Sequence, residues 1–303
     1  MQKKALSTTI YVIAAGAFGA FFRWLQNQSA FEADTGLLTK SVFNYLVPLV
    51  MIAAAVLFRS LIKKLKAEGL VPPKTIAEAF TSKSILYPVA FYTAAVVTVI
   101  GGIATFLEAG AVRFPGFYLI LGVTGIVCGA CFPMLCKSAR KKLSPKTVSF
   151  LMTTPVIMFA VWLVSSYKMN ADHPTLWSYA VEILAIVAAI IAFYYTAGIA
   201  FGRPQGYKGM FGAMFGTFMC MTALADSRLL GLQLMFLGSA MMLAIENALV
   251  LLNMKTAAEQ DEDTPRTQEE APAAAEADRV VIKAGEADLR SEPTKTAPER
   301  KKR

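Results

Sequence analysis

Long apolar runs separated by short polar segments dominate the pattern of this chain. An α-helix needs about 20 residues to cross roughly 30 Å of hydrocarbon, and eight runs approach or exceed that length: Ala5–Leu25, Val42–Ile62, Ile85–Leu107, Gly116–Cys136, Thr147–Tyr167, Leu176–Phe201, Gly209–Ala225 and Leu229–Leu252. The seventh run is the shortest and the richest in glycine, and without it the chain has seven spans. The pattern predicts an all-α, polytopic transmembrane helical bundle of about eight spans.

Composition agrees with a membrane protein and argues against a nucleic-acid-binding one. The 303 residues are 55% hydrophobic and only 17% charged, below the roughly 25% charge of soluble domains. The net charge is +9, but the basic residues lie between the apolar runs rather than on one soluble face. The lipid bilayer is therefore the predicted partner, and nucleic acid is not. All four cysteines fall within apolar runs, so a disulfide framework has no support.

The distribution of basic residues predicts the orientation. Fifteen Lys and Arg residues fall in the amino terminus and the inner loops of an eight-span topology, and five fall at the outer side. This excess is typical of cytosolic loops. Trp24, Trp162 and Trp177 lie near predicted outer span ends, where tryptophan prefers the headgroup level. Both ends of the chain are predicted to be cytosolic, in a plasma membrane of the bacterial inner-membrane type.

The two ends of the chain differ in character. The amino terminus resembles a signal sequence in charge, but its apolar run is long and lacks a small-residue cleavage site, so we interpret it as an uncleaved first span. Residues 1–254 form the predicted transmembrane domain. Residues 255–303 are rich in Ala, Glu, Pro, Thr and Lys and are predicted to be a disordered cytosolic tail. The tail is either a plain solvated segment or a site for a cytosolic partner or anionic lipid.

The longest inner loop contains the sequence Val71-Pro-Pro-Lys74 followed by Thr75–Phe80. Paired prolines fix the direction in which the chain enters the next segment. A short interfacial helix and an ordinary loop with one helical turn are equally good interpretations of residues 75–80.

Two pairs of spans favour an internal repeat. Tyr45–Leu57 and Tyr179–Ile191 align without a gap, and Arg113–Gly116 and Arg228–Gly231 open later spans in a similar way. The matched spans are four apart, as a parallel 4+4 repeat requires. The alternative is chance resemblance between runs of Ala, Ile, Leu and Val.

Polar residues inside apolar spans indicate a bundle interior or a water-filled cavity. Glu182 lies about 9 Å inside the sixth span at 1.5 Å per residue, and Asn44 and Arg23 lie at a similar level in other spans. Pro48 breaks the backbone hydrogen bonding of its span near the same depth. The predicted substrate-binding pocket is lined by Arg23, Asn44, Pro48 and Glu182. The alternative is a structural ion pair between Arg23, reaching toward the headgroups, and Glu182.

The last two spans carry further candidates. Gly209, Gly212, Gly216 and Cys220 form a ridge of small residues, which lets two helices approach closely. We interpret it as a packing face against a neighbouring span, or against a second copy of the chain or a membrane partner. Glu246 and Asn247 form an inner-side polar pair, either part of a path across the bundle or a simple interhelical hydrogen bond.

Metal and enzyme chemistry are poorly supported. The methionines of the seventh span and Cys128, Cys131 and Cys136 are soft ligands of the kind that bind copper(I), but the methionines do not share one face and the cysteines lack histidine partners. No metal site and no cofactor is predicted. The single histidine, His173, has no partner for a catalytic or metal motif, so an enzyme is not predicted.

Two classes of function remain. The first is a small-solute carrier, or a solute-binding membrane component, with an outer-side polar pocket; the prolines within the spans favour it. The second is a membrane sensor, scaffold or assembly subunit that acts through helix packing and the tail. The scarcity of charge within the spans argues against a proton- or ion-coupled pump.

Overall fold

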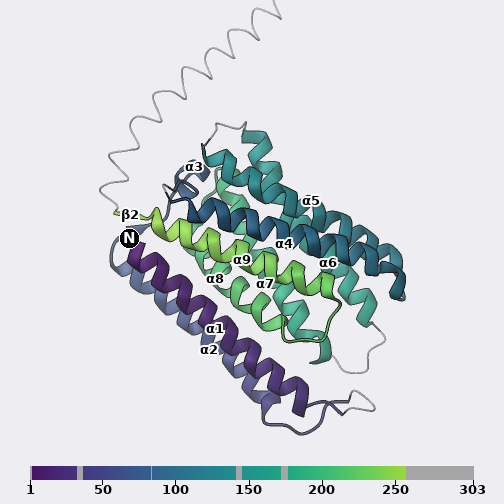
Figure 1. Ribbon diagram of the computed structural model, residues 1–303. Coiled ribbons are helices and arrows are strands. Elements are labelled where there is room, and N and C mark those ends of the chain that lie inside the picture. The colour runs from purple at the N-terminus through teal and green to yellow at the C-terminus, as the bar shows by residue number, and fades with distance from the viewer. Residues whose placement is uncertain (1, 33–36, 83, 141–144, 172–176, 257–303) are drawn as a thin grey trace, which may run out of the picture. The chain divides into compact units, whose positions relative to one another are not determined.

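The computed structural model describes residues 2–32, 37–82, 84–140, 145–171 and 177–256, and these are almost entirely helical (Figure 1). The described helices are α1 (Gln2–Ser29), α2 (Phe43–Ala67), α3 (Ile76–Ala79), α4 (Leu86–Glu108), α5 (Pro115–Arg140), α6 (Pro145–Asn170), α7 (Trp177–Ala200), α8 (Gly206–Ala223) and α9 (Leu230–Leu252). A 3-10 turn, η1 (Ala109–Ala111), follows α4, and the strands β1 (Leu70–Val71) and β2 (Lys255–Thr256) form a two-stranded sheet.

The predicted all-α bundle is confirmed, and each of the eight apolar runs corresponds to one long helix. Seven of the described helices are long and apolar enough to cross a membrane. The eighth, α8, falls outside that group, since Lys208 and its glycines lower its apolar character. It packs on α7, α1, α9 and α2 and buries most of its residues. Because four neighbouring helices cover α8, little of its surface faces lipid, and few of its residues need to be apolar for that reason.

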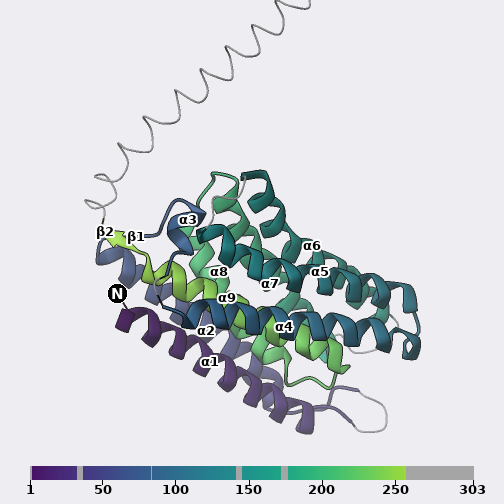
Figure 2. The same ribbon diagram turned by 45° about the horizontal axis from the view of Figure 1, so that its top comes forward.

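Helices α4 to α9 form a closed ring. Each packs on the next along the chain, and α9 packs back on α4. The paired helices α1 and α2 lie side by side along one side of the ring, with α1 against α8 and α9 (Figures 1 and 2). Because α9 is covered by both α1 and α4, it is the most buried of the candidate spans.

The long helices run alternately up and down, so the connections gather at two ends. One end, called here the Arg228 end, holds residues 30–32 and 37–42, the η1 turn and residues 224–229. The opposite end, called here the Glu246 end, holds the segment from β1 to α3, the turn before α8 and β2. Two turns at the Glu246 end use glycine in the left-handed region, Gly69 with φ 71° and Gly202 with φ 68°.

Glycines bring α4 into close contact with both of its neighbours. A Cβ atom on Gly102 would lie 2.7 Å from Ile126 N and 2.8 Å from Gly122 O of α5. A Cβ on Gly101 would lie 2.8 Å from Met235 N of α9. These are backbone atoms, which cannot move aside as a flexible side chain can. The α4 interfaces therefore depend on glycine, as small-residue contacts between membrane helices do.

The small-residue ridge of α8 also packs within the chain. A Cβ on Gly212 would lie 3.0 Å from Ala192 Cα of α7, and one on Gly216 would lie 2.9 Å from Leu243 Cδ1 of α9. Gly209 has more room, with Tyr195 Cβ at 3.6 Å, and Cys220 is fully buried in the core. The ridge thus contacts neighbouring helices, and a role toward a second copy or a membrane partner stays a prediction.

The predicted 4+4 repeat is not confirmed. In a parallel repeat the close contact between α4 and α9 would have an equivalent between α8 and α5. The close neighbours of α8 are instead α7, α1, α9 and α2. The segment after Pro73 contains a single helical turn, α3, whose amino end is capped by the Thr75 hydroxyl accepting from Glu78 N at 3.3 Å.

Candidate functional site

A chain of buried charges and amides crosses the Arg228 end of the bundle. Asp226, in the turn between α8 and α9, is its branch point: Arg23 Nε donates to Oδ1 at 2.7 Å, and Arg228 donates to Oδ2 at 2.7 Å. A second Arg228 nitrogen pairs with Glu182 Oε2 on α7. The four charges balance, so the cluster is neutral as a whole. Buried ions that are paired in this way avoid the large penalty of an isolated charge.

Arg23 is held by groups from several elements. Its side chain is 0% exposed, and besides Asp226 it donates to Gln26 Oε1 at 2.7 Å and to the Ser178 carbonyl at 3.2 Å. Gln26 extends the row of hydrogen bonds to α2, since its Nε2 donates to Asn44 Oδ1 at 3.2 Å. The alternative in which Arg23 reaches toward the headgroups is therefore not what the structure has, because the Arg23 side chain is buried and paired within the bundle.

Glu182 has donors on both carboxylate oxygens. Arg228 pairs with Oε2, and Trp162 Nε1 of α6 donates to Oε1 at 3.0 Å. Trp162 is 1% exposed and its ring stacks on Phe159 at 5.6 Å and contacts Phe236 at 4.2 Å. The predicted headgroup position of Trp162 is thus wrong. Its indole is a core group whose single polar atom bonds Glu182, as buried tryptophans require.

A polar pocket opens beside Glu182 and Arg228. It has a volume of about 280 Å³ and lies between α5, α6, α7 and the start of α9. Its polar wall consists of Tyr118, Trp162, Ser165, Ser166, Asn170, Glu182, Ser227 and Arg228. The volume lies just under the roughly 300–1,000 Å³ of typical small-molecule sites. The pocket combines hydroxyl, amide, carboxylate and guanidinium groups, so it suits a small polar solute.

Arg228 is the positively charged side chain in the wall of this pocket. Its side chain is 11% exposed, and within the described residues its Nε has no hydrogen-bond partner. Burial by itself would lower the pKa of Arg228, but the carboxylates of Glu182 and Asp226 outweigh burial and raise it above its usual value. The guanidinium therefore stays charged, and its one unpaired donor, Nε, is buried.

An aromatic stack closes the ring beneath this pocket. Phe159 stacks on Trp162 and lies 5.9 Å from the ring of Phe193 on α7. These rings and Phe236 of α9 are all buried. Phe193 lies between Glu182 and Thr196 along α7, so the stack separates the polar pocket from the polar groups near the Glu246 end.

The structure links three of the four predicted pocket residues, but not around one pocket. Arg23, Asn44 and Glu182 belong to the hydrogen-bonded chain described above. Glu182 lines the pocket at α5–α7, whereas Asn44 and Pro48 line a separate open hollow formed by residues 38–48. The alternative Arg23–Glu182 pair is replaced by two pairs, Arg23 with Asp226 and Glu182 with Arg228.

Sequence reasoning missed Asp226, Arg228 and Gln26 as members of the site. Asp226 and Arg228 stand in a connection, where charge is ordinary, so they carried no signal of burial. Gln26 and Asn27 follow Arg23 at the spacings i+3 and i+4, which places the three on one helix face. That spacing was a usable signal, because Asn27 also donates to Asp226 Oδ1 at 3.1 Å.

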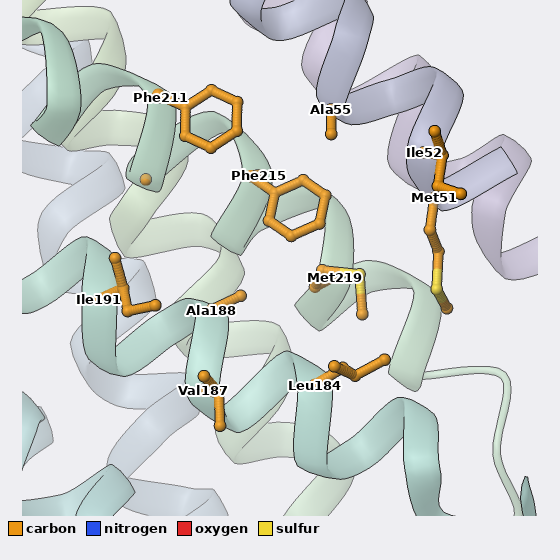
Figure 3. Close-up of a pocket in the computed structure, with 11 residues that line it drawn as sticks. Met51, Ile52, Ala55, Leu184, Val187, Ala188, Ile191, Phe211, Phe215 and Met219 are labelled. Carbon is orange, nitrogen blue, oxygen red and sulfur yellow. The ribbon is translucent and has the colours of Figure 1, made fainter. Parts of the chain in front are cut away.

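A different hollow opens sideways between α2 and the pair α7 and α8 (Figure 3). It has a volume of about 340 Å³. Phe211 and Phe215 of α8, whose rings stack 5.9 Å apart, lie across from Met51, Ile52 and Ala55 of α2 (Figure 3). Its lining side chains are apolar, so this lateral groove matches the hydrocarbon of a bilayer rather than a polar solute.

Within the described residues no group of three His, Cys, Asp or Glu side chains is placed to hold a metal ion. Cys128, Cys131 and Cys220 are buried free thiols, and the side chain of Cys136 lies outside the described ones, as does His173. No family model, no curated protein and no solved structure matches this chain. The fold defines the class: a helical bundle with the length and apolar character of a polytopic membrane protein.

Proposed function

We propose that the chain is a small-solute carrier and that the polar pocket between α5, α6 and α7 is its substrate site. The observation that carries the proposal is the pocket itself: a hollow of about 280 Å³ at one mouth of a ring of helices, with Glu182 and Arg228 in its wall. Polar groups at such depth are costly to retain and by default mark a substrate or ion path.

The chemistry of the wall favours a small polar solute without net charge. Glu182 and Arg228 already neutralise each other, so neither a free anion nor a free cation gains a full unpaired countercharge there. The side chains of Tyr118, Ser166 and Asn170 are hydrogen-bonding groups in the wall. Amino acids, which carry both charges, and polyols or hexoses, which carry many hydroxyls, meet these requirements.

The test is exchange of radiolabelled solutes into proteoliposomes that contain the full chain. Amino acids, hexoses and polyols are the probes, and empty liposomes give the background. The variant Ser166→Phe fills the pocket, because Ser166 is buried in its wall, and it leaves the four charged residues unmutated. Thr93→Phe, at an exposed position of α4, is the matched control. We expect exchange of one solute class, lost in Ser166→Phe and kept in Thr93→Phe.

Two results would count against a carrier. One is background exchange for every class by a well-folded wild-type protein. The other is exchange by Ser166→Phe at the wild-type rate, which would place the solute path elsewhere. Labelling of Asn170→Cys by a membrane-impermeant maleimide, in a chain whose four native cysteines are replaced, tests independently whether water reaches the pocket.

The second candidate, a sensor, scaffold or assembly subunit, draws support from the lateral groove. In the described part of the chain α2 has its main helix contacts with α1 and α8, so the groove presents apolar surface that a membrane helix of a partner would cover. Ala55→Trp would fill the groove. If Ala55→Trp alters the assembly of the protein and Ser166→Phe changes nothing, the subunit function is favoured over the carrier.

A further inference from the structure

A second polar centre lies inside the bundle, near the Glu246 end. A cavity of about 20 Å³ is lined by residues of α7, α8 and α9 together with Pro72 and Pro73. Glu246 and Asn247, both 2% exposed, reach it from α9, and Thr196 reaches it from α7. Glu182 and Thr196 are separated by about 21 Å along α7 at 1.5 Å per residue, so this centre is distinct from the solute pocket.

Glu246 has no basic partner among the described residues. Its one hydrogen-bond contact is Thr196 Oγ1, 3.2 Å from Oε2. By contrast, Glu68 pairs with Lys4, Asp226 pairs with Arg23, and Glu182 pairs with Arg228. An ionised carboxylate without a countercharge is expensive inside an apolar bundle, and such a group takes up a proton instead.

The Thr196 hydroxyl can donate to either of two acceptors, Ala192 O or Glu246 Oε2. A hydroxyl has one proton to donate, yet Thr196 Oγ1 lies 3.2 Å from both Ala192 O and Glu246 Oε2. Other buried threonines of this bundle, including Thr98, Thr217 and Thr222, donate to the carbonyl four residues earlier. If Thr196 does the same, its contact with Glu246 is a hydrogen bond only when the carboxyl supplies the proton.

Asn247 adds an acceptor that faces the same space. Its Oδ1 is buried and has no hydrogen-bond partner among the described residues. The cavity holds about one water molecule, which needs roughly 10–15 Å³ of such volume. A water at this point would donate to Asn247 Oδ1 and would receive a proton from Glu246.

A short segment covers this cavity on the side of the Glu246 end. Pro72 packs so closely on α8 that a Cβ on Gly206 would lie 2.7 Å from Pro72 Cγ. Tyr207 donates its hydroxyl to Leu70 O at 2.6 Å, and Asn253 Nδ2 donates to Ala79 O at 3.0 Å. Residues 70–79 thus form a lid that two side-chain bonds hold against α8 and α9.

Few other titratable groups face Glu246. Tyr195 of α7 lines the same cavity, and Cys128 of α5 is within electrostatic range. Helix α8 contributes Tyr207, which is bonded to the lid. The halves of α1 and α4 that lie toward the Glu246 end hold Lys4, Tyr11, Tyr87 and Tyr92. Of these, Lys4 pairs with Glu68 at 2.8 Å. None of these supplies a positive charge next to the Glu246 carboxylate.

We propose that Glu246 is a proton-binding site that exchanges its proton with water at the Glu246 end when the lid opens. In the step itself the carboxyl O–H bond breaks, the proton passes to a water molecule, and the carboxylate keeps the electron pair; no other bond changes. Where the bundle works as a carrier, which is the proposal above, this site supplies a proton that is coupled to the solute, against the expectation from the scarcity of charge within the spans. Proton binding itself does not depend on that use.

Infrared spectroscopy of the full chain in lipid tests the site without any substrate. At neutral pH we expect a carbonyl stretch from a protonated carboxylic acid, lost in Glu246→Gln and kept in Glu182→Gln. If the Glu246→Gln variant keeps the whole wild-type band, the proposal is overturned. So does the absence of the band together with a melting temperature that rises with NaCl but not with choline chloride, since that result assigns the site to sodium.

Hydrogen–deuterium exchange of the same band tests the lid. Tyr207→Phe removes the bond to Leu70 O, and the band should then shift faster after transfer to D₂O than in the wild type. Tyr194→Phe, at an exposed position of α7, is the matched control. Equal exchange rates in wild type and Tyr207→Phe would overturn the role of residues 70–79 as the cover of the site. Failure of solute exchange in proteoliposomes leaves both infrared results interpretable, so the two proposals fail separately.

Discussion

Glu182 and Glu246 are both buried carboxyl groups in long apolar helices, and the bundle holds them in opposite ways. Glu182 has an arginine on one oxygen and an indole donor on the other, beside an open pocket. Glu246 has a single hydroxyl contact, no basic partner among the described residues, and a cavity of about 20 Å³ under a lid. Glu182 therefore has a countercharge, whereas the absence of one favours the neutral form of Glu246.

The two centres also differ in access. The pocket at Glu182 lies at the mouth of the helical ring, and the aromatic stack of Trp162, Phe159 and Phe193 closes the ring below it. At the opposite end the segment 70–79 is tied to α8 and α9 by Tyr207 and Asn253. In the proposed carrier, which must open its two sides in turn, we expect the lid and the stack to be the elements that move.

The strongest way to break the charged centre is Asp226→Leu. Asp226 accepts from Arg23, Asn27 and Arg228, so its loss leaves two buried guanidinium groups without their shared carboxylate. Removing one partner of a buried ion pair costs about 3–5 kcal/mol. We expect a decrease of that size in the free energy of unfolding, measured by denaturant titration in detergent micelles. A loss below about 1 kcal/mol would place the network in solvent, as exposed pairs behave.

Glu182→Gln should have the second largest effect. The amide keeps an acceptor for Trp162 Nε1 but removes one of the two negative charges beside Arg228. Hydrogen bonds to charged groups contribute about 1.5–3 kcal/mol, and we expect a loss in that range because Asp226 still pairs with Arg228. The same denaturant titration measures it. A loss of about 3–5 kcal/mol, as expected for Asp226→Leu, would show that Asp226 does not compensate for the missing charge.

The contrast between the two acids could be predicted only in part from sequence. Glu182 and Glu246 stood out because each is an acid inside an apolar run, and the all-α fold could be predicted from the length of those runs. The residues that contact these two acids could not be predicted from the sequence. Arg23 and Asp226 are 203 positions apart, and only the packing of α1 against α8 and α9 brings them together.

Local chemistry also gave the wrong environment for some residues. Trp162 near a span end suggested the headgroup level, but a tryptophan whose Nε1 has a carboxylate to bond can be buried whole. The small-residue ridge of α8 was visible in the sequence, but the closer backbone approach of α4 and α5 at Gly102 and Gly122 was not singled out, although Gly125 and Gly129 of α5 have the same four-residue spacing as Gly212 and Gly216. Close contacts depend on which faces meet, and periodicity within one span does not contain that information.

Glu246→Gln sharpens the comparison from the other side. A glutamine keeps an oxygen acceptor and an N–H donor where a protonated carboxyl has an oxygen and an O–H donor. Since no countercharge is left behind, we expect the free energy of unfolding to change by less than about 1 kcal/mol, in contrast to the 1.5–3 kcal/mol of a charged hydrogen bond. Denaturant titration at neutral pH measures it. A loss as large as that of Glu182→Gln would mean that Glu246 is ionised and paired in the folded protein.

The smallest effect is expected for the exposed ion pair at the Glu246 end. Lys4 Nζ lies 2.8 Å from Glu68 Oε2, with side chains 57% and 34% exposed, so this pair has the chemistry of the Arg228 end without its burial. The Lys4 hydrogen bond lowers the pKa of Glu68 from its usual 4.5. A lowered folded-state pKa gives a contribution that is present above pH 4.5 and is lost as pH falls through the folded value. Glu68→Ala should therefore unfold like the wild type below that range, differ from it only marginally at neutral pH, and lose even that difference in high salt. A clear, salt-independent difference at neutral pH would show that burial is not what separates strong ion pairs from weak ones in this bundle.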